Sequence, residues 1–432
     1  MNAFFWLSFF ALACKTPGSP DHHGILFQNK GITCDGILDE SGQTVICGES
    51  SVYTATRDGS GDKDAFLAIL APDLKTGTGY SFGQPGVPER FEQVVSGNKG
   101  YWLEGFYGES KNKFLIRVDA LGKTVWASRS ERFQTFDEGH LAVNRQGEVL
   151  LATKDPSADA YQGFIHFFNA EGRCAWSRQV KSMEGMQDIL VANDQSFILS
   201  FRQKGAYIDA ALRKKYMINS FYKISREGQL LWSKSFHFDR EQSEQCEFQQ
   251  VLQDPSGAMY FIGRLEWKPN QKQELYVVKT LANGEIQWSK RYSGTGEWGF
   301  KSAALNAKGH LILLGDGYAK KGGLVLVEIQ PDGLPVWSKL LPSSYYDQAI
   351  QLISLKNGYG IVWDKLLNFA FFDIGPDGGS CFDEADLKLD VQNVPLLINE
   401  SRVVMDSIEG DWKPFSPVLV RHETIALSSN CP

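Results

Sequence analysis

One short phrase, Gly-x-x-x-Trp followed by Ser or Ala, recurs five times along this chain of 432 residues. Its tryptophans are spaced by 50, 56, 56 and 49 residues. They are Trp126, Trp176, Trp232, Trp288 and Trp337. Degenerate copies at Gly77–Tyr80 and Gly378–Phe382 extend the series in both directions. A period of about 45–56 residues is typical of propeller blades and other repeat arrays. The repeat therefore indicates that most of the chain is built from one recurring unit.

Each period contains four short apolar segments separated by turns. In the unit of residues 299–341 they are Lys301–Leu305, His310–Leu314, Leu324–Ile329 and Pro335–Leu340. The first and third turns of a unit end in glycine, because a short hairpin loop often closes with one residue at positive φ. The glycines of the first turns are Gly42, Gly100, Gly147, Gly257, Gly309 and Gly358, and Ser196 takes this place in the fourth unit.

Seven such units follow one another, near residues 32–82, 90–130, 137–180, 186–236, 247–292, 299–341 and 348–382. A ring of four-stranded sheets leaves only short, protected edges. We therefore expect an all-β chain that forms a single β-propeller, with seven four-stranded blades over residues 24–382. Gly24–Lys30 resembles a fourth strand without its preceding three, and it is expected to complete the last blade. Residues 383–432 are expected to form a short C-terminal β tail packed on the propeller.

The recurring tryptophan has two interpretations. Either it packs between neighbouring blades, or it stacks on a ligand. Burying an aromatic side chain hides about 150–250 Å² of surface, which is a large contribution to a core. A ligand site would not recur in every blade, so the packing interpretation is favoured.

Two segments carry a resemblance to a known family. Ala71–Gly77 (APDLKTG) and Val118–Trp126 (VDALGKTVW) resemble the tryptophan-docking repeat of quinoprotein-type, or PQQ-like, propellers. That family includes quinone-cofactor dehydrogenases and the propeller lipoprotein of the outer-membrane protein assembly machinery. The chain is also similar to uncharacterised propeller lipoproteins of bacterial envelopes. The resemblance covers residues 32–382 and implies a fold, not a function. Quinoprotein enzymes have a vicinal Cys-Cys pair at the cofactor, and this chain has none.

The first residues resemble an export signal. Residues 1–13 (MNAFFWLSFFALA) are an apolar run that ends in small residues before Cys14. This is similar to a bacterial lipoprotein signal, in which Cys14 would carry the lipid, and a plain secretory signal is the alternative. Residues 14–23 would then be a polar tether. The resemblance implies an outer-membrane-anchored lipoprotein of the bacterial cell envelope, which contacts the membrane through its lipid only.

Exported proteins form disulfides, and this chain contains seven cysteines. Cys381 and Cys431 bracket the C-terminal tail and are the best candidate pair. Cys34 and Cys47 flank a predicted turn and are a second candidate pair. The two cysteines that lie in different units, Cys174 and Cys246, are expected to be buried thiols.

Charge and motifs exclude several functions. The net charge of −7 argues against a nucleic-acid-binding protein, which usually shows a basic surface. The seven histidines fall in no metal-binding spacing, and no Cys/His cluster, Gly-x-Ser-x-Gly elbow or phosphate-binding loop occurs. Asp58–Asp64 offers oxygen atoms that suit Ca²⁺, but it lacks the final Glu of an EF-hand, and acidic Gly loops are usually solvated turns. We therefore expect neither a metal nor a cofactor.

The loops between the second and third strands differ in length and chemistry, and binding residues concentrate in such loops. The longest is Arg202–Asn219, and the loop Leu265–Gln273 and the link before the sixth unit lie on the same face. The candidate binding residues are Tyr207, Arg213, Lys214, Lys215, Tyr216, Trp267, Lys268 and Trp298. For the longest loop the alternative is a solvated insertion with a short helix.

These features predict a non-catalytic scaffold that binds an envelope protein or a glycan through this loop face. The alternative is an enzyme, a lyase or a hydrolase, with its site at the mouth of the central channel. A buried cluster of carboxylates with His or Tyr at that mouth would favour the enzyme.

Overall fold

The computed structural model describes most of the chain between residues 24 and 426. The described residues are 24–27, 31–39, 41–51, 63–72, 76–83, 87–97, 99–108, 112–134, 140–155, 162–181, 183–204, 217–238, 243–267, 272–294, 298–317, 323–341, 347–355, 358–365, 368–374, 385–386, 389–394, 396–400, 405–408, 413–414 and 419–426. Cys14, Cys381 and Cys431 lie outside them, so the lipid anchor and the disulfide stay predictions. Most of the Asp58–Asp64 loop also lies outside the described residues.

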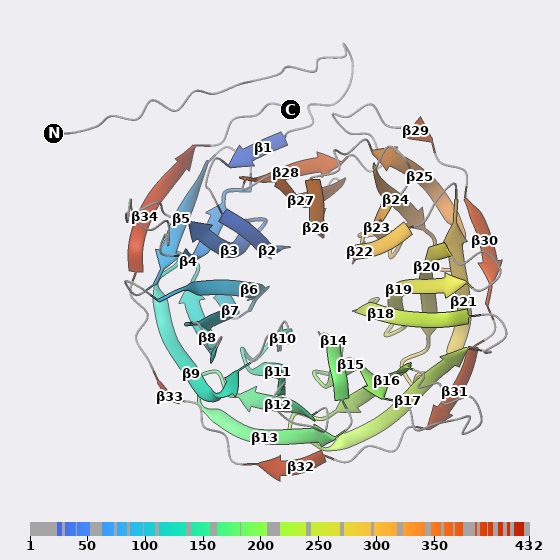
Figure 1. The fold of residues 1–432 in the computed structure, drawn as a ribbon, viewed down its shortest axis with the longest axis horizontal. Coiled ribbons are helices and arrows are strands. Elements are labelled where there is room, and N and C mark those ends of the chain that lie inside the picture. Colours follow the sequence, from blue (N-terminus) through green and yellow to red (C-terminus); the bar gives the residue numbers. More distant parts are fainter. Residues whose placement is uncertain are drawn as a thin grey trace.

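The described residues contain 34 strands and no α-helix, and the strands form seven sheets arranged in a ring (Figure 1). Neighbouring strands pair antiparallel, as a meander of hairpins requires. The fold is a single all-β propeller. We name the sheets A to G in chain order, and the first strand of each sheet lies nearest to the central axis (Figure 1).

The strands of the first four sheets have the following bounds. Sheet A has β2 (Gly31–Leu38), β3 (Thr44–Ser51), β4 (Lys63–Leu70) and β5 (Thr76–Phe82). Sheet B has β6 (Glu89–Ser96), β7 (Gly100–Tyr107), β8 (Asn112–Asp119) and β9 (Thr124–Gln134). Sheet C has β10 (His140–Val143), β11 (Val149–Asp155), β12 (Gln162–Phe168) and β13 (Cys174–Lys181). Sheet D has β14 (Met183–Val191), β15 (Phe197–Lys204), β16 (Met217–Ile224) and β17 (Leu230–Phe238).

The last three sheets follow the same plan. Sheet E has β18 (Ser243–Gln253), β19 (Met259–Trp267), β20 (Lys272–Thr280) and β21 (Ile286–Ser293). Sheet F has β22 (Trp298–Leu305), β23 (Leu311–Gly317), β24 (Gly323–Ile329) and β25 (Pro335–Leu341). Sheet G has β26 (Asp347–Leu355), β27 (Gly358–Lys365), β28 (Asn368–Ile374) and, from the start of the chain, β1 (Gly24–Phe27).

The strand β1 occupies the place of the fourth strand of sheet G. It pairs antiparallel with β28, with Gly24 opposite Phe372 and Phe27 opposite Phe369. The two ends of the ring therefore share one sheet, which is the arrangement that the segment Gly24–Lys30 suggests in the sequence.

The C-terminal residues form a belt around the ring, and this corrects the expectation of four strands in each sheet. The belt consists of β29 (Ala385–Asp386), β30 (Asp390–Asn393), β31 (Leu396–Glu400), β32 (Met405–Ile408), β33 (Lys413–Pro414) and β34 (Leu419–Ala426). These strands pair with the fourth strands of sheets F, E, D, C, B and A in that order, so six sheets are five-stranded. The belt covers the outer edges of these sheets, which would otherwise offer unpaired backbone groups to other chains.

Turns of the expected kind connect the strands, with two corrections. Five of the first-turn glycines have positive φ: Gly42, Gly147, Gly257, Gly309 and Gly358. In sheet B, however, Lys99 has the positive φ (61°) in place of Gly100, and in sheet D it is Gln195 (66°), one residue before Ser196. Non-glycine residues pay a steric cost at these angles, which the surrounding hairpin must offset.

The recurring tryptophans contact the next sheet along the chain. The indole Nε1 of Trp176 donates a hydrogen bond to the carbonyl of Arg226 at 2.9 Å, and that of Trp288 donates to the carbonyl of Pro331 at 2.9 Å. A Cβ atom at Gly172 would lie 2.3 Å from the ring of Trp126, so only glycine leaves room for the ring. The glycine and the tryptophan of the repeat are thus linked, because the tryptophan of one sheet lies against a turn of the next.

A β-bulge in the first strands sets the geometry of the centre of the ring. In six sheets the register of the first strand shifts by one residue, and the residue after the shift is Asp35, Gln93, Asp188, Gln250, Ser302 or Gln351. In sheet C, His140 pairs with Ala152 as Asp188 pairs with Ser200, so it holds the equivalent position. A bulge redirects the side chains that follow it.

Candidate functional site

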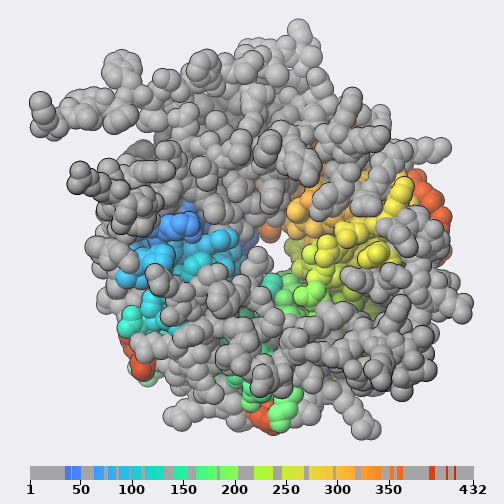
Figure 2. Space-filling view, in the orientation of Figure 1, coloured from blue at the N-terminus to red at the C-terminus, as the bar shows by residue number. Residues whose placement is uncertain are grey.

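A cavity of about 540 Å³ lies at the centre of the ring, where Figure 2 shows the surface hollowed. Residues of seven strands line it, and these are the first strands of the seven sheets. A volume of this size lies within the usual range for small-molecule sites. The cavity is therefore the candidate functional site.

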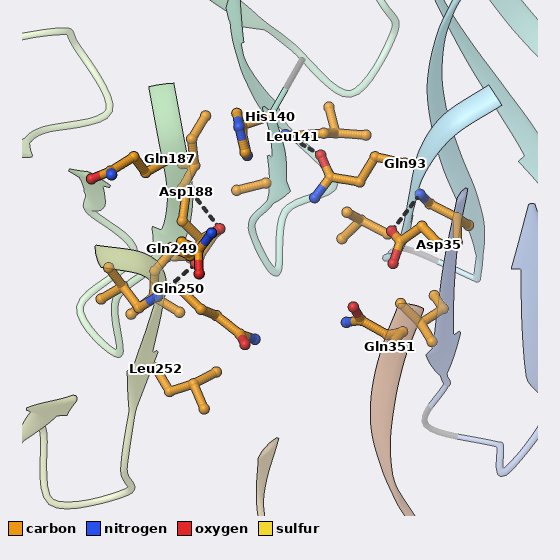
Figure 3. A pocket seen from close by; sticks show the side chains of 18 of the residues that line it. Asp35, Gln93, His140, Leu141, Gln187, Asp188, Gln249, Gln250, Leu252 and Gln351 are labelled. Carbon is orange, nitrogen blue, oxygen red and sulfur yellow. Dashed lines mark hydrogen bonds between the residues drawn. The ribbon is translucent and has the colours of Figure 1, made fainter. Parts of the chain in front are cut away.

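The six bulge residues and His140 hold equivalent positions in the seven sheets, and six of these seven side chains line the cavity. They are Asp35, Gln93, His140, Asp188, Gln250 and Gln351. Figure 3 shows Asp188 and Gln250 on one side of the opening, Asp35 and Gln351 on the other, and Gln93 and His140 between them. Ser302 holds the seventh position and is 1% exposed. We call these seven residues the polar ring.

Five members of the polar ring accept a hydrogen bond from the first strand of the next sheet. The bonds run from Val94 N to Asp35 Oδ2 (3.0 Å), Leu141 N to Gln93 Oε1 (2.5 Å), Val251 N to Asp188 Oδ2 (2.6 Å), Ala303 N to Gln250 Oε1 (2.7 Å) and Leu352 N to Ser302 Oγ (3.1 Å). These bonds tie neighbouring sheets together and fix the side chains of the ring. A site whose side chains are already held loses little entropy when a ligand binds.

Two members of the polar ring have strongly shifted pKa values of opposite kind. Burial raises the pKa of Asp188 to about 7, and the charge of Asp35 adds to the rise, while backbone N–H groups that donate to the carboxylate oppose it. Burial lowers the pKa of His140 to about 4, and the positive charge of Lys113 lowers it further. At neutral pH His140 is therefore neutral, and Asp188 is close to half protonated.

A buried ion cluster supports the wall of the cavity in sheet B. Lys113 on β8 is fully buried, and its Nζ lies 2.5 Å from Glu104 Oε1 and 2.6 Å from Glu92 Oε2. Burial alone would lower the pKa of Lys113, but the two carboxylates outweigh it and raise this pKa above its ordinary value. Glu92 also lines the cavity. The cluster therefore places an ion pair, formed by Glu92 and Lys113, at the wall of the cavity next to the polar ring.

Two amide side chains of the cavity wall have unused hydrogen-bonding atoms. Gln187 is 8% exposed, and its Nε2 donor has no partner among the described residues. The Oε1 acceptor of Gln249, on the neighbouring sheet, likewise has none in the described part of the chain. Buried polar atoms without partners are rare in folded proteins, and one reason for them is a ligand that supplies the missing bond.

The described residues that line the central cavity include none of the binding residues predicted on the loop face. Tyr207, Arg213, Lys214, Lys215, Tyr216 and Lys268 lie outside the described residues. Trp267 is the last residue of β19. Trp298 was expected to be exposed, but it is 3% exposed and packs in the core between sheets E and F. This is a correction, because a buried indole is not available to an external ligand.

The polar ring was not predicted from the sequence. Its signal in the sequence is weak, because Asp, Gln, His and Ser are different residue types at equivalent places of the repeat. Aligning the six units that have a turn glycine would nevertheless have placed one polar residue seven positions before that glycine, and in the fourth unit Asp188 lies eight positions before Ser196. The enzyme alternative named carboxylates with His at the channel mouth, and the cavity does bring Asp35, Glu92, Asp188 and His140 together.

Neither a candidate metal cluster nor a membrane-spanning helix occurs among the described residues. These residues contain no group of three or more His, Cys, Asp or Glu side chains placed to bind a metal ion. No helix among them has the length and hydropathy of a membrane span.

Comparison with known proteins identifies no relative by sequence. No protein-family model and no curated protein matches the chain. Its fold is similar to the crystal structure of a puromycin hydrolase, at 13% sequence identity and a TM-score of 0.45. The match covers 77% of this chain and 50% of that chain, so this chain spans about half the length of the hydrolase. At this level the likeness does not bear on function. The resemblance to quinoprotein-type repeats has no matching family model behind it.

Proposed function

We propose that this chain is a seven-bladed β-propeller lipoprotein of the bacterial cell envelope that binds a glycan in its central cavity without catalysing a reaction. The observation that carries this proposal is the polar ring, in which amide and carboxyl side chains surround a cavity of about 540 Å³. An amide both donates and accepts hydrogen bonds, as does a sugar hydroxyl. Gln187 and Gln249 add one unused donor and one unused acceptor.

The loop face remains part of the proposal. Its aromatic and basic residues, Tyr207, Arg213, Lys214, Lys215, Tyr216, Trp267 and Lys268, would extend the site beyond the cavity. An envelope protein is the other partner that such a surface would suit, since aromatic and basic residues are common anchors at interfaces.

The binding site is tested with a variant that leaves the sheets connected. Gln351 lines the cavity, and its side chain makes no hydrogen bond to another described residue, so Gln351→Ala removes a polar group from the wall without cutting a tie between sheets. Calorimetric titration with soluble peptidoglycan fragments and core oligosaccharides should show binding that weakens about 2- to 10-fold in this variant, the value of one hydrogen bond. Gln287→Ala, on the exposed side of β21, is the matched control. Equal affinities for all three proteins would contradict binding in the cavity.

The proposed location at the membrane is tested by replacing Cys14, the residue proposed to carry the lipid. Cys14→Ser should release the protein from the membrane fraction, because a lipid chain is the only membrane contact proposed. Its melting temperature should not change, because the first described strand of the propeller begins at Gly24, ten residues after Cys14. Retention in the membrane fraction would contradict the lipid anchor.

A second function is favoured by one observation. Asp188, with a pKa of about 7, and Asp35 line the same cavity, and a protonated and an ionised carboxyl group are what glycoside hydrolysis requires. If the cavity is catalytic, incubation with the same oligosaccharides should release shorter products, detected by mass spectrometry. Asp188→Asn should abolish this release while retaining binding.

A further inference from the structure

Two arginines and one glutamate form a cluster between sheets D and E. Nη1 of Arg202 on β15 lies 2.7 Å from Oε1 of Glu247 on β18. Nε and Nη2 of Arg264 on β19 lie 2.8 and 2.6 Å from Oε2 of the same carboxylate. One negative charge thus holds two positive charges, and the cluster carries an excess of one positive charge.

The arginines keep unused donors and remain accessible. Their side chains are 33% and 39% exposed, whereas that of Glu247 is 18% exposed. Nε of Arg202 is buried and has no hydrogen-bond partner in the described part of the chain. A guanidinium has five N–H donors, so one shared carboxylate leaves most of the donors of both arginines open.

The cluster lies beside the central cavity. Glu247 precedes Gln249 by two residues on β18, which is roughly 7 Å along a strand. A Cβ atom at Gly185 would lie 3.2 Å from Nη2 of Arg202, so this guanidinium packs over β14, the strand that also carries Gln187. Both arginines stand near the ends of second strands, next in sequence to the loops that carry Arg213, Lys214, Lys215 and Lys268.

We propose that Arg202 and Arg264 form a binding site for an oxyanion, a carboxylate or phosphate group, at the edge of the cavity. Two guanidiniums held by one carboxylate keep further N–H donors close to each other, and a guanidinium binds planar or tetrahedral oxyanions through paired charge-assisted hydrogen bonds. Glu247 orients the two side chains and lowers their net charge. In an acidic glycan bound in the cavity, a carboxylate or phosphate group would occupy this site; that extension rests on the proposed function, whereas the oxyanion site itself does not.

The test uses inorganic phosphate and glucuronate as probes and glucose as the neutral control, with the mature chain in calorimetric titrations at low and high salt. Phosphate or glucuronate should bind, glucose should not compete at this site, and added salt should weaken binding. Arg264→Gln should weaken anion binding roughly tenfold. The matched control is Arg226→Gln, which removes another exposed, ion-paired arginine, in the turn between β16 and β17 and paired with Glu148, next to β11 of sheet C.

Glu247→Gln tests how the charge of the Glu247 carboxylate affects anion binding by the two arginines. A glutamine keeps the side-chain length and an acceptor oxygen toward the arginines, but it removes the negative charge that lowers the net charge of the cluster. Anion binding should therefore strengthen, by about threefold or more, because the local net charge rises by one. Unchanged or weaker anion binding in this variant would contradict the oxyanion site. Binding of phosphate alone or of glucuronate alone identifies which oxyanion the site prefers, and either supports the site.

Several results would overturn the site. They are the absence of binding for both anions, equal weakening in Arg226→Gln, and unchanged or weaker anion binding in Glu247→Gln. Gln351→Ala separates this proposal from the proposed function, because it should weaken binding of neutral oligosaccharides and leave anion binding unchanged. Anion binding without any oligosaccharide binding would contradict the proposed function and retain the oxyanion site.

Discussion

The outer and inner edges of the seven sheets differ in how far their residue types recur from one sheet to the next. On the outer side, tryptophan recurs in the fourth strands of five sheets, and Trp126, Trp176 and Trp288 lie against a turn of the next sheet. On the inner side, the equivalent positions carry Asp, Gln, His, Asp, Gln, Ser and Gln. A constant residue packs toward the next sheet in five sheets, whereas varied residues give each side of the cavity its own chemistry. In this ring, repetition therefore accompanies packing, and variation accompanies the candidate site.

The largest effect should come from the constant position. Trp288→Ala should lower the free energy of unfolding by about 3 kcal/mol, the lower end of the range for a core tryptophan, because it removes a half-buried aromatic ring that packs on the core of sheets E and F. It also removes the indole hydrogen bond to Pro331. The measurement is chemical denaturation followed by circular dichroism.

The neighbouring residue supplies the control for this prediction. Gln287 is exposed and precedes Trp288 on the same strand, so Gln287→Ala should change the free energy of unfolding by less than about 0.5 kcal/mol. If the two variants unfold alike, the tryptophan does not join the sheets, and the contrast between the two edges fails.

The next effect depends on pH and comes from the inner edge. Because the pKa of Asp188 is raised to about 7, the folded state binds its proton more tightly than the unfolded state, and this group destabilises the fold as pH rises from about 4 to 7. Because the pKa of His140 is lowered to about 4, this group stabilises the fold as pH rises from about 4 to 6.5. Between about pH 4 and 6.5 the two effects have opposite signs and offset each other.

Removing one of the two titratable groups should reveal the pH dependence of stability that the other group causes. In His140→Gln, stability relative to the original protein should fall by roughly 1.4 kcal/mol per pH unit between about pH 4.5 and 6, since one proton is no longer compensated. Asp188→Asn should show the reverse slope. Denaturation curves at three pH values measure both slopes, and parallel pH profiles for the original protein and both variants would show that these side chains are not buried as described.

The outer edge could largely be predicted from the sequence, and the belt could not. The phrase Gly-x-x-x-Trp encodes a local turn and a contact with the next unit, so its spacing gives the strands and the ring. The belt strands β29 and β33 have two residues each, which is too short for a periodic pattern. β29 pairs with a strand more than 40 residues earlier and β33 with one more than 280 residues earlier, and this pairing is decided by the free edges of those sheets, which no local pattern shows.

The candidate site was predicted less well, for a related reason. Whether the side chain of Gln93 or Gln351 faces the axis depends on a one-residue bulge, and a shift of one residue turns a side chain to the other face of a strand. Single polar residues in apolar strands are commonly structural, and five members of the polar ring do tie sheets together. Trp298 shows the opposite error, since an aromatic residue in a link was expected to be exposed and the fold buries it.

The smallest effect distinguishes the two kinds of residue within the polar ring. Ser302 Oγ accepts a hydrogen bond from Leu352 N in a buried environment, so Ser302→Ala leaves a buried N–H without its partner and should cost about 1–3 kcal/mol. Gln351→Ala removes no such tie and should cost less than about 0.5 kcal/mol. Hydrogen exchange should show faster exchange at the Leu352 amide in Ser302→Ala only. Equal stabilities, with no change at that amide, would mean that the hydroxyl does not join sheets F and G and that the ring is held by its backbone alone.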